Sequence, residues 1–299
     1  MGIPAALKLK SVGSLAGIVI PGKNKARLMP ALQHAGFESD DIYVVNKESL
    51  GDDISSTIKL SGADAIITIT FPWKIPATVL NILPERCFNI HPGALPKYRG
   101  ADPIFWQIKN REATVTITIH SMTNELDKGA IVLQANVPLL NEETYGMLVQ
   151  KIAWFIADMV QKLTEAIYTN NIRFVEQEEN GSTAYYNKPG WKDLLISWKD
   201  QDASEIMALV NAANPRYNGA ITNIDGKQLN ILEVSVVTLN NAPENAVPGQ
   251  VVYADNIYGP IVSCINKEFL KINTVCMEEG FLSGVKLLGF GVVSGKQLL

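Results

Sequence analysis

Apolar runs alternate with helical patterns in the first half of the chain. Residues 15–20 and 65–70 are short, β-branched runs with few polar interruptions, which is typical of strands covered on both faces. Residues 115–119 alternate with threonine, as a strand near an edge or antiparallel to its neighbours does. Helices are predicted over 2–10, 26–34, 49–61 and 145–169, and in the last of these apolar residues recur at spacings of three and four. This alternation predicts an open, mostly parallel α/β sheet of the Rossmann-like type.

The pattern of apolar and polar residues changes in the second half of the chain. Residues 176–198 lack periodicity and carry turn residues, which indicates a linker. A helix is predicted over 203–213, with Asp202 or Ser204 as its N-cap and Asn214-Pro215 at its end. Short strands with tight turns follow, one turn being Asp225-Gly226: 219–224, 229–239, 250–254, 261–265 and 269–274. We therefore predict an α/β domain over 1–175, the linker 176–198, and a small OB-like β-barrel over 199–299.

Composition narrows the class of protein. A length of 299 residues favours two domains, and 47% apolar with 19% charged residues is ordinary for a globular protein. No run approaches the roughly 20 apolar residues of a membrane helix, and the N-terminus lacks a secretion pattern, so a soluble, cytoplasmic protein is expected. The three cysteines and three histidines show no metal-ligand spacing, so we expect no metal. A net charge of −4 offers no general attraction to nucleic acid, which would require local basic patches.

The segment 87–106 carries the most informative polar residues. Asn89 and His91 stand two apart on a predicted strand and therefore point to the same side. Pro92 and Gly93 begin a loop, which places the pair at the carboxyl end of that strand, where open α/β sheets bind ligands. Asp127 follows the strand 115–119 in a loop that contains glycine. A lone histidine in a turn is usually structural, and so is an aspartate before Lys-Gly. Only the combination of Asn89, His91 and Asp127 therefore indicates a functional site.

Four motifs occur in order along the first domain: Asn89-x-His91, Leu-Pro-Lys-Tyr-Arg-Gly at 95–100, Thr-Ile-His-Ser-Met at 118–122, and Asp127-x-Gly129. This series resembles the 10-formyltetrahydrofolate-dependent formyltransferase family. The resemblance extends over residues 15–169, and residues 196–236 are similar to the C-terminal domain of the methionyl-tRNA formyltransferases within that family. It implies transfer of a formyl group from 10-formyltetrahydrofolate to an amine, without a metal.

Two features depart from the family pattern. Gly93 and Ala94 stand where the family usually has serine and leucine after the histidine. Backbone contacts made by this loop would survive the change, whereas a contact through a serine hydroxyl would not. The family also opens on a short apolar strand before its first helix, but residues 2–10 already have the pattern of that helix, so we expect the first strand of the sheet to be missing.

The chemistry of formyl transfer suggests a role for each candidate catalytic residue. The reaction needs a donor to the tetrahedral oxyanion and a route for the proton that the amine loses. The Asn89 amide donates without changing protonation state and suits the oxyanion. His91 titrates near neutral pH and suits donation or proton relay. A carboxylate beside it, which we take to be Asp127, would stabilise the charged imidazole and accept the amine proton through an ordered water; the resemblance implies the same role.

The resemblance also places the folate. It implies a pterin pocket between the loop 71–76 and the Asp127 loop, with apolar walls. The candidate wall residues are Phe71, Trp73, Ile75, Leu95 and Leu126. His34 and His120 are predicted to be structural.

Three hypotheses for the function remain open. The length of the chain, its C-terminal pattern and the Arg-Leu-Met-Pro run at 27–30, which resembles part of an acceptor loop, favour the α-amino group of methionyl-initiator tRNA. From residue 201 onward, six Lys/Arg stand against nine Asp/Glu, which favours a small amine such as an amino-sugar nucleotide. The two departures suggest a folate-binding regulator without activity, but such a protein would not need Asn89, His91 and Asp127 together. No obligate protein partner is expected.

Overall fold

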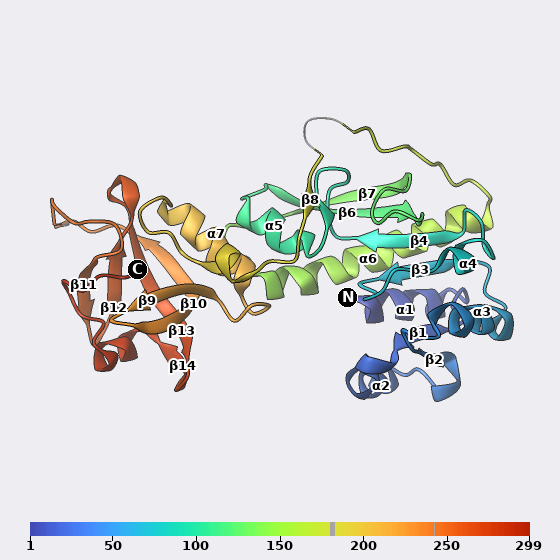
Figure 1. Ribbon diagram of the computed structural model, residues 1–299, viewed down its shortest axis with the longest axis horizontal. Helices are drawn as coiled ribbons and strands as arrows, with labels where there is room; N and C mark the ends of the chain where they lie inside the picture. The colour runs from blue at the N-terminus through green and yellow to red at the C-terminus, as the bar shows by residue number, and fades with distance from the viewer. Residues whose placement is uncertain (180–182, 242) are drawn as a thin grey trace. The chain divides into compact units, whose positions relative to one another are not determined.

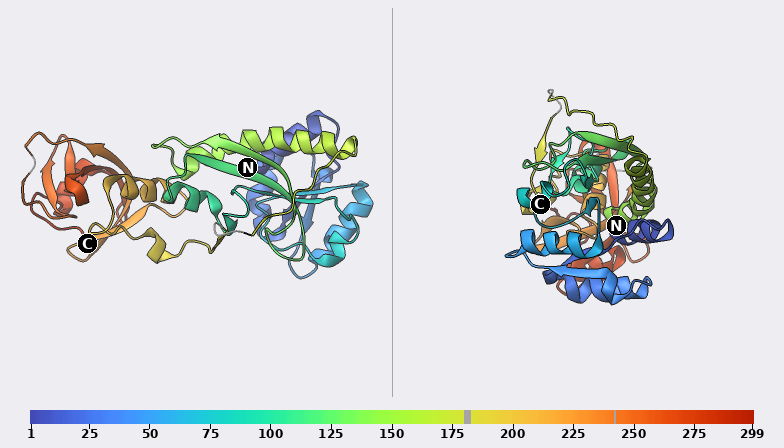
Figure 2. Two further views of the ribbon diagram at one scale, coloured as in Figure 1. Left: turned by 90° about the horizontal axis from the view of Figure 1, so that it is seen from above. Right: turned by 90° about the vertical axis from the view of Figure 1, so that its right-hand side faces the viewer.

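The computed structural model describes residues 1–179, 183–241 and 243–299 (Figure 1), so residues 180–182 of the predicted linker lie outside the described residues. The chain divides into two compact units. The first, the α/β unit, consists of residues 1–103, 115–137 and 149–186. The second, the C-terminal unit, consists of 104–114, 138–148 and 187–299, apart from the undescribed residue 242. Both are drawn from two further sides in Figure 2.

The main sheet of the α/β unit aligns polar residues across three strands. Its strands follow the order β3 (Ile66–Ile69), β4 (Cys87–His91), β6 (Thr114–Ser121) and β7 (Ile131–Pro138). β3 and β4 are parallel, with Thr68 opposite Asn89. β4 and β6 are antiparallel, with Asn89 opposite His120, so the antiparallel direction considered for residues 115–119 is confirmed. The register therefore places Thr68, Asn89 and His120 in one row.

A second, smaller sheet pairs β1 (Ile18–Pro21) with β2 (Ile42–Val45), again in parallel. The parallel strands predicted near residues 15–20 and 65–70 are thus present. The prediction that both are covered on both faces holds only in part, because all four residues of β3 and the first two of β1 are half-buried. β3 ends the order of its sheet, and in the described part of the chain it pairs only with β4.

The predicted helices of the α/β unit are confirmed to within two residues. They are α1 (Gly2–Ser11), α2 (Lys25–His34), α3 (Leu50–Ser61) and α6 (Tyr145–Tyr168). Two short helices, α4 (Ala77–Leu80) and α5 (Pro103–Lys109), were not predicted. None of the helices in the described residues is long and apolar enough to cross a membrane.

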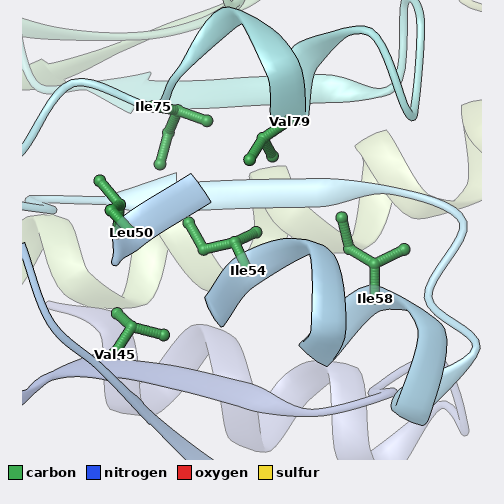
Figure 3. Packing of buried hydrophobic residues seen from close by; sticks show 6 residues of the cluster. All are labelled: Val45, Leu50, Ile54, Ile58, Ile75 and Val79. Atoms are coloured by element: carbon green, nitrogen blue, oxygen red, sulfur yellow. The ribbon is translucent and has the colours of Figure 1, made fainter. Parts of the chain in front are cut away.

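The helix α3 builds the core beneath the loop at residues 71–76. Leu50, Ile54 and Ile58 recur every four residues and therefore lie on one face of the helix. They pack with Val45 of β2 and with Ile75 and Val79, as Figure 3 shows. Burial of these aliphatic side chains fixes the end of the 71–76 loop against the helix layer.

From residue 187 onward, the C-terminal unit contains the helix α7 followed by an antiparallel sheet. α7 (Ala203–Ala213) starts at Asp202, whose carboxylate accepts a hydrogen bond from the Glu205 backbone N–H, as an N-cap does. The sheet order is β11 (Val251–Asp255), β12 (Gly259–Ser263), β13 (Phe269–Met277), β10 (Lys227–Val237) and β9 (Ala220–Ile224), with β14 (Gly280–Ser283) beside β13. The predicted Asp225-Gly226 hairpin is confirmed, with φ positive at both residues (48° and 79°), as a type I′ turn requires.

The last residues of the chain connect the two ends of this sheet. The Leu298 N–H donates to the Gly249 carbonyl just before β11, at 2.8 Å. Leu299 exchanges backbone hydrogen bonds with Asn223 of β9. Because β9 and β11 end the strand order, this tail closes the sheet in the manner of the small barrel that was predicted.

A buried threonine ties this closure to the core of the unit, and its removal gives a test. The Thr222 hydroxyl accepts from the Trp198 indole N–H (2.9 Å) and donates to the Leu299 carbonyl (2.8 Å). Thr222→Val keeps the shape but leaves a buried donor and acceptor unpaired, so we expect the free energy of unfolding to fall by about 1–3 kcal/mol. Urea unfolding would measure this, with Thr238→Val, at an exposed position, as the control. Equal stability of the two variants would contradict the assignment.

Candidate active site

Four polar side chains converge at the carboxyl end of β4. Asn89 and His91 come from β4, His120 from β6, and Asp127 from the loop that follows β6. Asp127 Oδ1 lies 3.6 Å from His91 Nδ1 and 3.6 Å from His120 Nε2. Asn89 Nδ2 lies 3.1 Å from His120 Nε2. The structure thus brings together the three residues selected from the sequence and adds His120 to them; we call these four the tetrad.

Backbone carbonyls fix which ring nitrogen of each histidine carries hydrogen. A carbonyl only accepts, so His91 Nε2, at 2.6 Å from the Tyr98 carbonyl, is the donor. By the same argument His120 Nδ1 donates to the Ser121 carbonyl at 2.8 Å. In the neutral rings, His91 Nδ1 and His120 Nε2 therefore carry lone pairs that face the site. His91 Nδ1 is too far from Asp127 Oδ1 for a direct hydrogen bond.

The Asn89 amide is held in one orientation. Its oxygen accepts from the Thr68 hydroxyl at 2.7 Å, and its nitrogen donates to the lone pair of His120 Nε2. An amide nitrogen has two hydrogens, and the second has no hydrogen-bond partner in the described part of the chain. Asn89 thus presents an oriented donor at the site.

Two glycines let the Asp127 carboxylate reach the histidines. The Gly100 N–H donates to Asp127 Oδ2 at 2.9 Å, which leaves Oδ1 facing the imidazoles. Gly100 has φ of +97°, and a Cβ there would lie 2.2 Å from the Tyr186 carbonyl oxygen. At Gly129 a Cβ would lie 1.8 Å from the Ser121 carbonyl oxygen, so only glycine lets the loop pass this close to β6. Asp127 itself has φ of 58°, a left-handed conformation uncommon outside glycine.

Burial and neighbouring charges set the protonation states. Burial lowers the pKa of His91 below its ordinary value, and the carboxylate of Asp127 only partly opposes this. Burial pushes the pKa of Asp127 upward, but its interactions with His120 and His91 and the hydrogen bond from the Gly100 N–H outweigh burial and lower that pKa overall. The charge of His91 lowers the pKa of Asp127 only when the imidazole is protonated, a state that burial disfavours. The Gly100 N–H lowers this pKa in either protonation state of His91. We conclude that at neutral pH the site holds a neutral His91 beside an ionised Asp127.

The glycine that replaces the family's serine is needed by this loop. A Cβ at Gly93 would lie 2.7 Å from His91 Nε2 and 2.8 Å from Pro103 Cβ. The Gly93 carbonyl accepts from the buried Thr118 hydroxyl at 2.7 Å. The loop therefore folds directly onto the imidazole, where the Tyr98 carbonyl reaches Nε2. With this backbone, a serine at position 93 would displace His91.

The candidate folate-binding residues lie in different surroundings. Ile75 is in the α3 core, and Phe71 packs against the same core with its ring edge-on to Trp73, at a centroid distance of 5.7 Å. Leu95 is buried in the loop that leads to Tyr98. Leu126, next to Asp127, is 53% exposed. The pterin pocket stays a prediction, with Leu126 as the wall residue adjacent to the tetrad in sequence.

A cavity of about 500 Å³ lies on the α/β unit beside the 71–76 loop. Its lining residues are Lys47, Glu48, Leu50, Gly51, Pro72, Trp73, Lys74 and Pro76. Because this lining includes neither the tetrad nor Leu126, we do not take this cavity for the predicted pterin pocket. Among the described residues, no three or more His, Cys, Asp or Glu side chains are arranged to hold a metal ion.

Sequence reasoning missed contacts that join distant segments. His120 is predicted to be structural, and its contact with Asn89, which was not predicted, is compatible with that role. The signal was present, because His120 lies in the Thr-Ile-His-Ser-Met motif, but its position opposite Asn89 depends on the strand register. The Gly100 N–H and the Tyr98 carbonyl act through the backbone and leave no signal in side-chain identity.

Comparison with known sequences gives two matching domain models and relatives that are matched over most of their length. Residues 20–163 match the formyl transferase family, and residues 191–284 match the formyl transferase C-terminal domain. A methionyl-tRNA formyltransferase from Lachnospira eligens is 31% identical, over 79% of this chain and 75% of that protein. One from Geobacter metallireducens is 28% identical, over 91% of this chain and 88% of that protein.

Solved structures show the same fold. The N-formyltransferase from Helicobacter canadensis, in complex with folinic acid and dTDP-3-aminofucose, has a TM-score of 0.57 at 18% identity, over 85% of this chain and 98% of that one. HypX from Aquifex aeolicus, in complex with tetrahydrofolic acid, has a TM-score of 0.64 at 18% identity. The match covers 91% of this chain and 47% of HypX, so this chain spans about half the length of that protein. Both matched domains and the relative at 31% identity lead to one conclusion: the chain belongs to the formyltetrahydrofolate-dependent formyl transferase family.

Proposed function

We propose that this chain transfers a formyl group from 10-formyltetrahydrofolate to the α-amino group of methionyl-initiator tRNA, with Asn89, His91 and Asp127 as its catalytic residues. The observation that carries the chemistry is the convergence of an oriented amide donor, a neutral imidazole and an ionised carboxylate. The match of residues 191–284 to the C-terminal domain and the names of the relatives support the choice of acceptor.

Attack of the amine on the formyl carbon forms a C–N bond and turns the carbonyl oxygen into an oxyanion. The second amide hydrogen of Asn89 donates to this oxygen, and because Thr68 holds the amide oxygen, the donor is oriented before the substrate arrives. An oriented donor stabilises the developing charge without reorganisation in the transition state.

The attacking nitrogen must lose a proton, and His91 Nδ1 has the lone pair to accept it because Nε2–H is engaged with Tyr98. Asp127 Oδ1, 3.6 Å away, stabilises the resulting imidazolium, directly after a small shift or through a water. As the bond between the formyl carbon and N10 breaks, the His91–Asp127 pair returns the proton to N10. The pair ends in its starting state, so no other acid or base is required.

Two observations weaken the case for tRNA and keep an amino-sugar nucleotide as the second candidate. The six basic residues against nine acidic ones in 201–299 make a poor match to a phosphate backbone. The Arg-Leu-Met-Pro run at 27–30, which resembles an acceptor loop, lies inside helix α2. Leu28 and Met29 pack partly buried against the core there, so this run gives no separate support for tRNA.

The catalytic role of Asp127 is tested by Asp127→Asn. The substitution preserves size and the acceptor for the Gly100 N–H but removes the charge that stabilises the imidazolium. We expect kcat to fall by about 10²-fold or more, with folate affinity and fold retained. Kinetics at saturating substrate concentrations would measure kcat, folate titration would measure the affinity, and circular dichroism would check the fold. An unchanged kcat would contradict the catalytic role and show that Asp127 is only a turn residue.

The protonation states give a prediction that does not depend on the acceptor. The pKa of His91 should lie below the ordinary histidine value of about 6.5, because burial disfavours the imidazolium. In Asp127→Asn it should fall further, because the opposing carboxylate is gone. Since the chain has three histidines, an NMR titration resolves each of them. A pKa of His91 above 6.5, or one insensitive to the substitution, is the contrary result.

The acceptor is tested by offering both candidates. With 10-formyltetrahydrofolate as donor, we expect formylation of methionyl-initiator tRNA, with kcat/KM falling about tenfold or more between 50 and 200 mM salt as phosphate contacts release counterions. Formylation of an amino-sugar nucleotide instead, with less than about a twofold effect of salt, would replace tRNA by the second candidate. Folate binding with neither product would indicate a regulator without activity.

A further inference from the structure

A glutamine outside both matched domain models holds the backbone of the Asp127 loop. Gln177 lies between the matched segments 20–163 and 191–284, in a region predicted from its composition to be a linker. Its Nε2 donates to the carbonyl oxygens of Asp127 and Gly129, both at 2.8 Å. Both hydrogens of this amide therefore form hydrogen bonds with the backbone of the loop that carries the Asp127 carboxylate.

The other end of the same amide is held by a buried arginine. Arg99, only 5% exposed, donates from Nε (3.1 Å) and from Nη2 (2.8 Å) to Gln177 Oε1. Its Nη1 donates to Glu179 at 2.9 Å. An arginine only donates and a carbonyl only accepts, so the orientation of the Gln177 amide is fixed by its partners. All four hydrogen-bonding positions of the side chain are used.

Arg99 and its neighbour thus hold Asp127 in two ways. Gly100 donates its N–H to the carboxylate, while Arg99 holds the backbone of the same residue through Gln177. These two residues form β5 (Arg99–Gly100), which pairs in parallel with β8 (Tyr185–Tyr186). Asp127 needs such support, because its φ of 58° is sparsely populated for a residue with a side chain and persists only where neighbours enforce it.

We infer that Gln177 is a positioning residue for formyl transfer: it keeps the Asp127 loop in the conformation that sets the carboxylate beside His91. This inference rests on the proposed function, in which Asp127 stabilises the charged imidazole. Without the two donated hydrogen bonds, the loop can relax toward negative φ, and the carboxylate leaves its place at 3.6 Å from the ring.

The sharpest variant is Gln177→Glu. Glutamate keeps the size and strengthens the contact with Arg99, but it presents an oxygen instead of two hydrogens to the Asp127 and Gly129 carbonyls. We expect kcat to fall about tenfold or more, with KM for the folate within about threefold, because the loss is one of geometry. Gln161→Glu, on α6, is the matched control; Gln161 donates to Glu165, and the change should leave kcat within about twofold.

A double-variant cycle separates positioning from a general structural effect. In the Asp127→Asn background there is no carboxylate charge left to misplace, so Gln177→Glu should change kcat by less than about twofold. An equal fold-loss in both backgrounds, or no loss in the parent, overturns the inference. Should Gln177→Glu fail to fold, Gln177→Met, of similar length but without either donor, enters the same cycle.

An NMR titration of His91 gives a readout that does not require the acceptor to be known. If Gln177 sets the Asp127 carboxylate beside the ring, Gln177→Met, which removes both donors without adding a charge, should lower the pKa of His91 in the same direction as Asp127→Asn does. An unchanged His91 titration in a folded Gln177→Met protein overturns the inference even if kcat falls. If the parent chain formylates neither acceptor, the proposed function fails, while this titration still decides the role of Gln177.

Discussion

The candidate site depends on where one carboxylate is held. Asp127 sits on a loop after β6, with φ in the left-handed region, and its Oδ1 faces both imidazoles only because the Gly100 N–H holds Oδ2. The close approach of Gly129 to β6 and the pairing of β5 with β8 serve this placement. If the carboxylate were lost from this position, His91 would lose the charge that opposes the lowering of its pKa by burial.

The site contains an imidazole and a carboxylate, and their surroundings give them different protonation states. Burial keeps His91 neutral, and the donors around Asp127 keep it ionised. A neutral imidazole can accept a proton, and an adjacent carboxylate stabilises the cation that results. The tautomer of His91 is fixed, because Tyr98 engages Nε2 and leaves the lone pair of Nδ1 on the side of Asp127.

Much of this arrangement follows from local sequence patterns. The predicted helices, the Asp202 cap and the Asp225-Gly226 hairpin are present because their signals depend on neighbours along the chain. The exposure of β3 was not predictable from its apolar run, since it depends on which strands pair beside it. Gln177 lay in a stretch without periodicity, and only the fold brings it to the Asp127 loop.

The catalytic assignment is tested most directly by a crystal structure of this chain with a stable analogue of 10-formyltetrahydrofolate that keeps the formyl group at the N10 position. We predict that the folate lies against the Asp127 loop, with the carbonyl oxygen of its formyl group about 3 Å from Asn89 Nδ2 and the formyl carbon within reach of an amine beside His91 Nδ1. Binding instead in the cavity lined by Pro72 and Trp73, with the formyl group away from Asn89 and His91, would contradict the account.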